Sequence, residues 1–267
     1  MRARVLILWS CTLAVPLAVS PACRAQQPDT GLAAQVQALP PLPSQATAEQ
    51  LEQRGDELRQ HKQSLEALEF YGAALKLKPN DASLLNKAGI ASLQVQRYGV
   101  AKRCFELAIK ANRTAPEPYN NLGVIAYLQK KYSRAIGQYK KAIELQPLSA
   151  SFHSNLGTAH FARKHFPEAA AEYARAWSLD PDIFTRSSTS GVNAHLMSPE
   201  DRAHFDFMLA RMFAENNQLD ESLRYLRRAL EEGYGRVQEV YESASFAALR
   251  ADPRFTELMQ NQPPAIR

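Results

Sequence analysis

The chain has 267 residues, 45% of them hydrophobic, and is therefore long enough to bury a substantial core. Its formal net charge of +5 falls to +2 without Arg2, Arg4 and Arg24 of the N-terminal leader, since 29 basic and 27 acidic side chains then remain. An excess this small gives no electrostatic basis for nucleic-acid binding.

The first 25 residues have the order of a secretory signal peptide. A basic start, "MRAR", precedes an apolar run of 15 residues from Val5 to Val19 and a small-residue end, "SPACRA". The run is shorter than the roughly 20 residues of a spanning helix, and it contains Pro16. We therefore expect an exported protein of the bacterial periplasm or cell envelope; an uncleaved membrane anchor is the alternative.

Two cleavage sites compete in this leader. Cleavage after Ala25 releases a chain that begins at Gln26, whereas cleavage before Cys23 leaves a cysteine for lipidation and a membrane-anchored lipoprotein. Ser20 stands where a lipobox has an aliphatic residue, which favours cleavage after Ala25. Cys104 is then the sole thiol of the mature chain, and its apolar helical surroundings predict a buried small hydrophobic residue.

After a Pro- and Gln-rich tether at 26–46, a period of 34 residues runs through four units: 48–81, 82–115, 116–149 and 150–183. Five positions recur in step. They hold glycine at position 8, alanine at 20 and 27, an aromatic residue at 24, and proline at 32 in three units. The residues are Gly55, Gly89, Gly123 and Gly157; Ala67, Ala101, Ala135 and Ala169; Ala74, Ala108, Ala142 and Ala176; Tyr71, Phe105, Tyr139 and Tyr173; Pro79, Pro147 and Pro181.

This pattern resembles the tetratricopeptide repeat (TPR), in an exported bacterial form. The resemblance implies an all-α protein, a right-handed α-solenoid of stacked antiparallel helix pairs. Within a unit, small residues at positions 8 and 20 would let the two helices approach, and the aromatic residue at 24 would fill the space to the next unit. The closing proline would end the second helix.

Local signals predict the same helix starts. Thr47 with Gln50, and Thr114 with Glu117, have the spacing of a capping box, and Asp81 is a favourable N-cap. In the second unit Arg113 replaces the closing proline, from which we expect a slightly longer helix.

The repeats are interrupted by a polar loop at 184–199. Ser198 and Pro199 then predict a helix start, followed by a fifth, degenerate unit at 200–236, an amphipathic capping helix and turn at 237–260, and a tail at 261–267. The core positions expected of the fifth unit are Leu209, Ala210, Phe213, Ser222, Leu226 and Ala229.

No motif for catalysis, a cofactor or a metal was found, and we expect a non-enzymatic protein. His153 and His160 are seven residues apart, and packing explains them better than metal binding. Lys130, Lys131 and Arg134 lie among tyrosines, but those tyrosines occupy structural positions, so a solvated face is favoured over nucleic-acid binding. An enzyme with its site in loop 184–199 has little support, because this loop lacks paired carboxylates.

The TPR resemblance implies a partner-binding groove lined by the first helix of each unit. Six groove residues, Ile90, Leu93, Val124, Tyr127, Leu128 and Phe161, are apolar without being required for the core, which predicts exposed apolar surface. The tether or the loop covering this surface is the alternative. The predicted groove consists of Asn86, Ile90, Leu93, Gln94, Glu117, Asn120, Val124, Tyr127, Leu128, Ser151, Ser154, Thr158 and Phe161.

The leading hypothesis is a protein–protein interaction adaptor of the cell envelope that binds a peptide or helix of a partner protein in this groove. Groove positions of the first unit are largely charged: Glu49, Glu52, Asp56 and Arg59. The alternative is a lipid-anchored assembly factor, acylated at Cys23, for a secretion, pilus or outer-membrane complex. The sequence predicts no small-molecule substrate.

Overall fold

The computed structural model describes residues 45–184 and 199–261, and every regular element in these ranges is a helix. The expected leader, most of the tether, the loop segment 185–198 and the last six residues lie outside the described residues, as do Cys23 and Ser198. None of the described helices is both long and apolar enough to cross a membrane.

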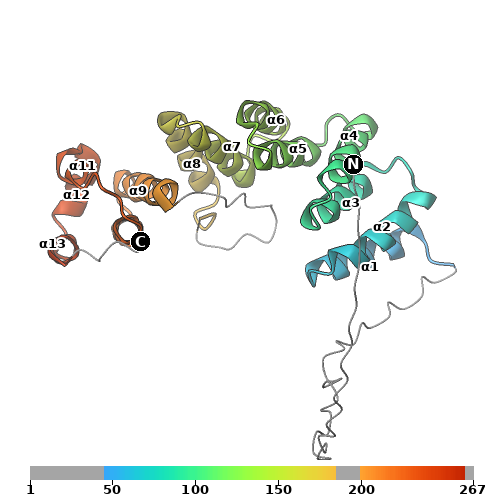
Figure 1. Cartoon of the computed structure of the whole chain (residues 1–267), viewed down its shortest axis with the longest axis horizontal. Helices are drawn as coiled ribbons and strands as arrows, with labels where there is room; N and C mark the ends of the chain where they lie inside the picture. Colours follow the sequence, from blue (N-terminus) through green and yellow to red (C-terminus); the bar gives the residue numbers. More distant parts are fainter. Residues whose placement is uncertain (1–44, 185–198, 262–267) are drawn as a thin grey trace, which may run out of the picture. The chain divides into compact units, whose positions relative to one another are not determined.

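Four helix pairs follow one another with the predicted period, and each pair packs against the next (Figure 1). We call the first helix of each pair helix A and the second helix B. The pairs are α1 (Ala48–Gln60) with α2 (Ser64–Leu77), α3 (Ala82–Gln94) with α4 (Tyr98–Ala111), α5 (Glu117–Leu128) with α6 (Tyr132–Leu145), and α7 (Ala150–Ala162) with α8 (Phe166–Leu179). The all-α solenoid of stacked helix pairs is thus confirmed.

The recurring residues form the inside of each pair. All eight repeated alanines are fully buried, as are the aromatic residues at position 24. Each aromatic ring lies over the glycine of its own unit: a Cβ atom added at Gly123 would lie 2.5 Å from Tyr139 Cε1. The glycine therefore makes room for a ring within the unit, whereas the sequence had suggested that the ring fills the space between units.

Two of the three capping predictions are confirmed. Thr47 and Gln50 form the predicted capping box, and Asp81 Oδ1 accepts a hydrogen bond of 2.9 Å from the backbone N–H of Leu84. The predicted box at Thr114 and Glu117 is wrong. Pro116 is the N-cap of α5, and Thr114 donates instead to the side chain of Asn112.

The helix before Arg113, α4, is not longer than the other B helices. It ends at Ala111, at the same position within its unit as the other three B helices, because Asn112 takes an extended conformation. The missing proline therefore does not change the helix length.

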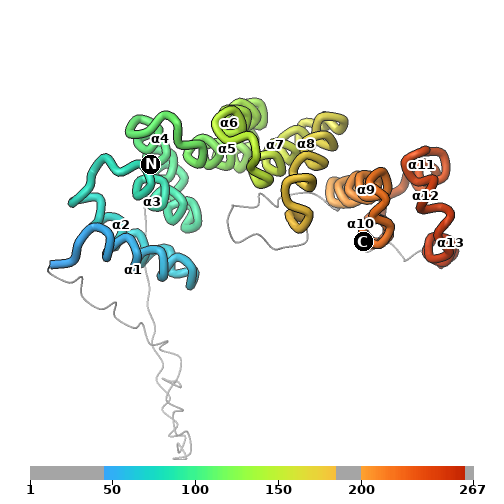
Figure 2. The backbone as a smooth tube through the Cα atoms, turned by 180° about the vertical axis from the view of Figure 1, so that it is seen from behind, coloured from blue at the N-terminus to red at the C-terminus, as the bar shows by residue number. Residues whose placement is uncertain are grey.

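The fifth unit consists of α9 (Pro199–Glu215) and α10 (Leu219–Glu231), and its six predicted core residues are all buried. Gly233, with a φ of 89°, follows the end of α10. Instead of one capping helix, the chain then forms α11 (Gln238–Glu242), the 3₁₀ turn η2 (Ala244–Phe246), α12 (Ala247–Arg250) and α13 (Pro253–Gln260) (Figure 2).

Short helices replace the single capping helix because caps interrupt the chain twice. The Ser243 side chain caps η2 by accepting a hydrogen bond from the backbone N–H of Ser245. The Asp252 side chain caps α13, which begins at Pro253, by accepting one from the backbone N–H of Arg254. These pieces still cover the fifth unit, since Val240, Phe246 and Leu249 are fully buried in one cluster with α9 and α10.

Candidate functional site

The predicted groove residues lie on α3, α5 and α7, and they divide into exposed, half-buried and buried groups. Gln94 and Glu117 are exposed. Asn86, Ile90, Leu128, Ser151, Ser154 and Thr158 are half-buried. These eight form the accessible part of the predicted face.

The expected exposure of four apolar groove residues is wrong: Leu93, Val124, Tyr127 and Phe161 are buried. Leu93, Val124 and Tyr127 belong to a core cluster that extends from the second unit to the fourth, and the centroid of the Tyr127 ring lies 5.3 Å from that of Tyr132. Burial also raises the pKa of Tyr127 to about 12. These side chains therefore hold neighbouring helices together.

Phe161 joins the fourth unit to the fifth. Its ring centroid lies 5.4 Å from that of Phe166 in its own unit, and 5.8 and 6.0 Å from His204 and Phe205 of α9. In place of an exposed groove residue, the structure has a packing contact between units.

A chain of asparagine side chains connects three A helices. Asn121 Nδ2 donates to Asn86 Oδ1 at 3.0 Å, and Asn155 Nδ2 donates to Asn120 Oδ1 at 2.9 Å. Asn120 Nδ2 donates to Asn121 Oδ1 at 3.3 Å, which links the two pairs. Asn120 is buried, whereas the other three asparagines are half-buried. The chain therefore forms an amide strip along this face.

The groove prediction missed Asn121 and Asn155. Asn86 and Asn120 stand at position 5 of their units, and Asn121 and Asn155 stand at position 6. The signal was the recurrence of asparagine at these adjacent positions, which face one another when A helices lie side by side in register.

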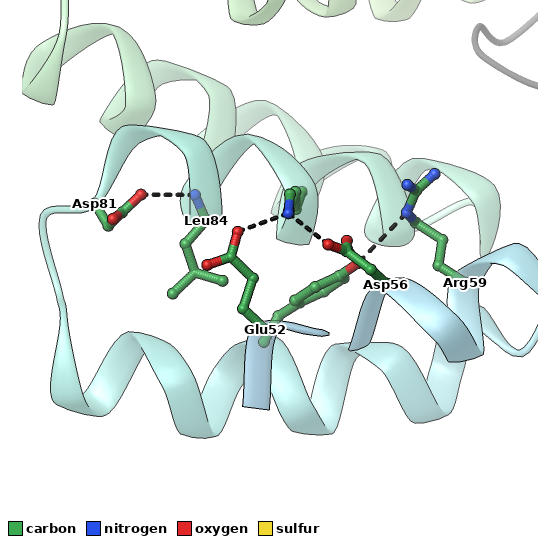
Figure 3. A network of polar contacts seen from close by, with 7 residues as sticks. Glu52, Asp56, Arg59, Asp81 and Leu84 are labelled. Carbon is green, nitrogen blue, oxygen red and sulfur yellow. Dashed lines mark hydrogen bonds and ion pairs between the residues drawn. The ribbon is translucent and has the colours of Figure 1, made fainter. Parts of the chain in front are cut away.

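The acidic groove positions of the first unit are paired within the chain, and Figure 3 shows this for Glu52 and Asp56. Lys87 Nζ lies 2.6 Å from Glu52 Oε1 and 2.5 Å from Asp56 Oδ2. Glu49 pairs with Lys78, a hydrogen bond that lowers the pKa of this carboxyl to about 2. The three carboxylates at these groove positions are thus each paired with a lysine.

Asp56 also orders the aromatic residue of its unit. The hydroxyl of Tyr71 donates to Asp56 Oδ1 at 2.7 Å, and Arg59 Nε donates to the same hydroxyl at 3.4 Å. Burial and the neighbouring carboxylate raise the pKa of Tyr71 well above its usual value. Asp56 and Arg59 therefore act in packing the first unit.

The two histidines of α7 are packing residues, as predicted: both are buried. His153 Nδ1 lies 2.6 Å from Glu172 Oε2, and its Nε2 lies 3.0 Å from the carbonyl oxygen of Pro147. Burial lowers the pKa of His160. Within 45–184 and 199–261 no three metal-binding side chains lie together.

Cys104 is half-buried rather than fully buried, and desolvation raises the pKa of its thiol. A raised pKa reduces the thiolate fraction, so this position favours packing over reactivity.

A pocket of about 300 Å³ between α8 and α9 was also not predicted. Small residues of α8, including Ala170 and Ala174, face Phe207 and Met208 of α9, and Arg211 pairs with Glu215 at its rim. It lies where the 34-residue period is interrupted.

Comparisons with known proteins agree with the repeat pattern. A family model described as TPR repeat matches residues 125–163. A search of curated proteins returns no significant match.

Solved structures with similar folds include MamA from Desulfovibrio magneticus, with 18% identity over 74% of this chain and 96% of that one and a TM-score of 0.48. YrrB, a TPR protein with an unusual peptide-binding site, shares 18% identity over 73% and 91% of the two chains, with a TM-score of 0.46. The first TPR of Spaghetti (RPAP3), bound to an HSP90 peptide, shares 21% identity over 44% and 94%, with a TM-score of 0.42.

Because these TM-scores lie below 0.5, the assignment of the family rests on the other observations. They are the 34-residue period, the helix pairs at matching positions, the glycine–aromatic contacts and the family-model match. The chain is a tetratricopeptide-repeat protein.

Proposed function

We propose that this protein is a non-enzymatic interaction scaffold that binds a peptide or helix of a partner protein along its A helices. The asparagine strip formed by Asn86, Asn121, Asn120 and Asn155 carries this proposal. Each side-chain amide offers both donors and an acceptor, and can therefore exchange hydrogen bonds with the backbone of another polypeptide. TPR proteins are typically non-catalytic scaffolds, which supports the same function.

Apolar contacts on this face come from Ile90 and Leu128. Both are half-buried and adjoin the cluster that contains Leu93, Val124 and Tyr127. A partner segment would bury their remaining exposed surface while the asparagine side chains fix its register. Affinity from two partly exposed side chains is modest, so we expect a reversible complex.

Site-specific photo-cross-linking tests this proposal. A photoreactive residue replaces Gln94 or Ser83, which are exposed on α3, and in a matched control it replaces Leu107, which is exposed on α4. We expect the α3 positions to give a discrete adduct with one envelope protein and Leu107 to give none. Equal adducts from both helices would contradict binding along the A helices.

A second experiment tests the asparagine strip itself. The double variant Asn86→Ala/Asn155→Ala removes the two half-buried ends of the strip, and Asn80→Ala changes an exposed asparagine in the turn before α3. We expect the α3 adduct to decrease severalfold in the double variant alone. If a folded double variant formed as much adduct as the parent protein, the asparagine strip would have no role in binding the partner.

We propose the cell envelope as the location, on the basis of the basic, apolar and small-residue segments of the leader. The mass of the mature N-terminus separates the two forms. A chain starting at Gln26 supports a soluble adaptor, whereas a diacylglyceryl group on Cys23 supports the lipid-anchored assembly factor. An intact leader with Met1 would contradict both.

A further inference from the structure

The turn between helix A and helix B carries a strained residue in every repeat. Lys62, Gln96, Lys130 and Lys164 occupy the same position of the four units and have φ values between 58° and 63°. A side chain in this left-handed conformation costs about 1–2 kcal/mol, and glycine would avoid that cost. Three of the four are lysines, whereas the corresponding residue of the fifth unit is Asn217, with a φ of 57°.

Further cations surround these turns. We call the set the basic turn edge: Lys62, Arg97, Lys130, Lys131, Arg134, Arg163 and Lys164. None of the seven makes an ion pair with a described residue. Glu66 and Glu168 begin nearby helices, but the stretch from Arg97 to Arg163 has no acidic residue in its A–B turns.

The turns of successive units lie beside one another. The asparagine hydrogen bonds join residues 35 apart, so α3, α5 and α7 run parallel and in register, and their ends align. Lys130, Lys131, Arg134 and Arg163 accordingly line one open pocket of about 360 Å³, together with Tyr132 and Ser133. Four cations therefore converge from two units.

We infer that the basic turn edge docks an acidic segment of a partner polypeptide, separately from the groove. Unpaired cations brought together at the surface attract a chain of carboxylates by charge complementarity. Successive repeats of a solenoid rotate relative to one another, so a flexible chain can follow the turns, whereas a planar membrane meets few of them at once.

Single-stranded nucleic acid fits this edge less well. It binds through aromatic rings with free faces on which bases stack. Here the Tyr132 ring packs on Tyr127, and the Phe166 ring is stacked on His204 with centroids 4.1 Å apart. The aromatic residues of these two turns are therefore already engaged in packing.

The test measures binding of the purified chain to labelled polyglutamate and labelled oligothymidylate by fluorescence anisotropy, and to vesicles containing phosphatidylglycerol by co-sedimentation. The edge variant is Lys130→Gln/Lys131→Gln/Arg134→Gln/Arg163→Gln. Its matched control, Lys76→Gln/Arg103→Gln/Lys110→Gln/Lys140→Gln, removes four other exposed cations that lack ion pairs with described residues. Both variants therefore have the same net charge.

We expect the edge variant to bind polyglutamate about tenfold more weakly, and the control to bind as the parent does within about twofold. Binding should weaken as salt rises, because these charges are exposed. Equal losses in the two variants would show a net-charge effect and overturn the inference. It would be overturned equally by tighter binding of oligothymidylate or vesicles at the edge, or by no binding of polyglutamate at low salt.

A second variant tests whether weaker polyglutamate binding comes from the lost charges rather than from loss of folding. Lys130→Gly/Lys164→Gly removes two charges at positions whose backbone suits glycine, so the fold should be retained. We expect it to weaken polyglutamate binding about threefold while the α3 cross-link of the groove persists. Unchanged polyglutamate binding in this variant would contradict the inference and leave the groove proposal unaffected.

Discussion

At Gly123 the ring of Tyr139 lies where a side chain would begin. A Cβ atom there would be 2.5 Å from Tyr139 Cε1 and 2.6 Å from Cδ1, and the ring is buried. We expect Gly123→Ala to destabilise the protein by about 1–3 kcal/mol, because overpacking outweighs the helix propensity gained from alanine. Urea unfolding followed by circular dichroism measures the difference.

Gly137 of α6 is the matched control, since an added Cβ there meets no atom within 4 Å. Gly137→Ala should stabilise the protein by about 0.5–1 kcal/mol, because it raises the helix propensity of α6 without a clash. Destabilisation by both substitutions, or by neither, would contradict the assigned glycine–aromatic contact.

Asp206 is a buried carboxyl between α9 and α10 that the sequence did not single out. Arg228 Nε lies 3.1 Å from its Oδ2, but neither carboxyl oxygen has a hydrogen-bond partner of good geometry among the described residues. Burial, with a smaller contribution from Glu232, raises its pKa to about 6 from the usual 3.8. The folded state therefore binds this proton more tightly than the unfolded state does.

The contribution of Asp206 to stability should be largest below about pH 4 and should be lost as the pH rises to about 6. Asp206→Asn cannot ionise, so we expect it to stabilise the protein by about 1–3 kcal/mol at pH 7 and to flatten this pH dependence. Unfolding at pH 4 and pH 7 measures both effects. Asp220→Asn, at an exposed position, is the matched substitution, and an unchanged slope in Asp206→Asn would exclude Asp206 as its source.

The sequence predicted which residues are small or aromatic inside a unit, because those recur at a fixed period. It did not predict the burial of Leu93, Val124 and Tyr127, since a residue's exposure on helix A depends on how closely the next unit packs. The asparagine contacts were missed for the same reason: they join side chains of different units.

At the scale of the element, the A–B turns are alike in backbone and different in side chain. Lys130→Gly should stabilise the protein by about 1 kcal/mol, because a φ of 58° is strained for lysine and unstrained for glycine. In the same unit, Lys140→Gly lies inside α6 and should destabilise by about 1 kcal/mol. Thermal unfolding compares the two; the same sign in both would contradict the strain assigned to the turn.

The period predicted that each regular unit would be a pair of helices, and side-chain caps stand at the predicted starts Thr47 and Asp81. The short helices of the C-terminal segment were not predicted, because an apolar pattern alone does not show where a chain changes direction. The side-chain caps at Ser243 and Asp252 divide that pattern into short helices.

At the scale of the whole molecule, each unit packs against its sequence neighbours in addition to its own helix pair, so stability depends also on the contacts between units. The junction of α8 with α9 is where the period is interrupted and where a pocket of about 300 Å³ remains. Phe161 spans this junction through Phe166, His204 and Phe205. Tyr173 and Trp177 of α8 add ring contacts to Phe205 and Phe213, so a cluster of aromatic side chains couples the four repeats to the C-terminal units.

Phe161→Ala should therefore act differently from an ordinary core truncation. We expect a loss of about 3–5 kcal/mol, together with a larger fall in amide protection for α9 and α10 than for α1–α4. Hydrogen exchange read by mass spectrometry compares these segments, and Leu148→Ala, at an exposed position, should change neither. A uniform fall in protection would show that Phe161 supports the array as one cooperative body, rather than coupling two parts of it.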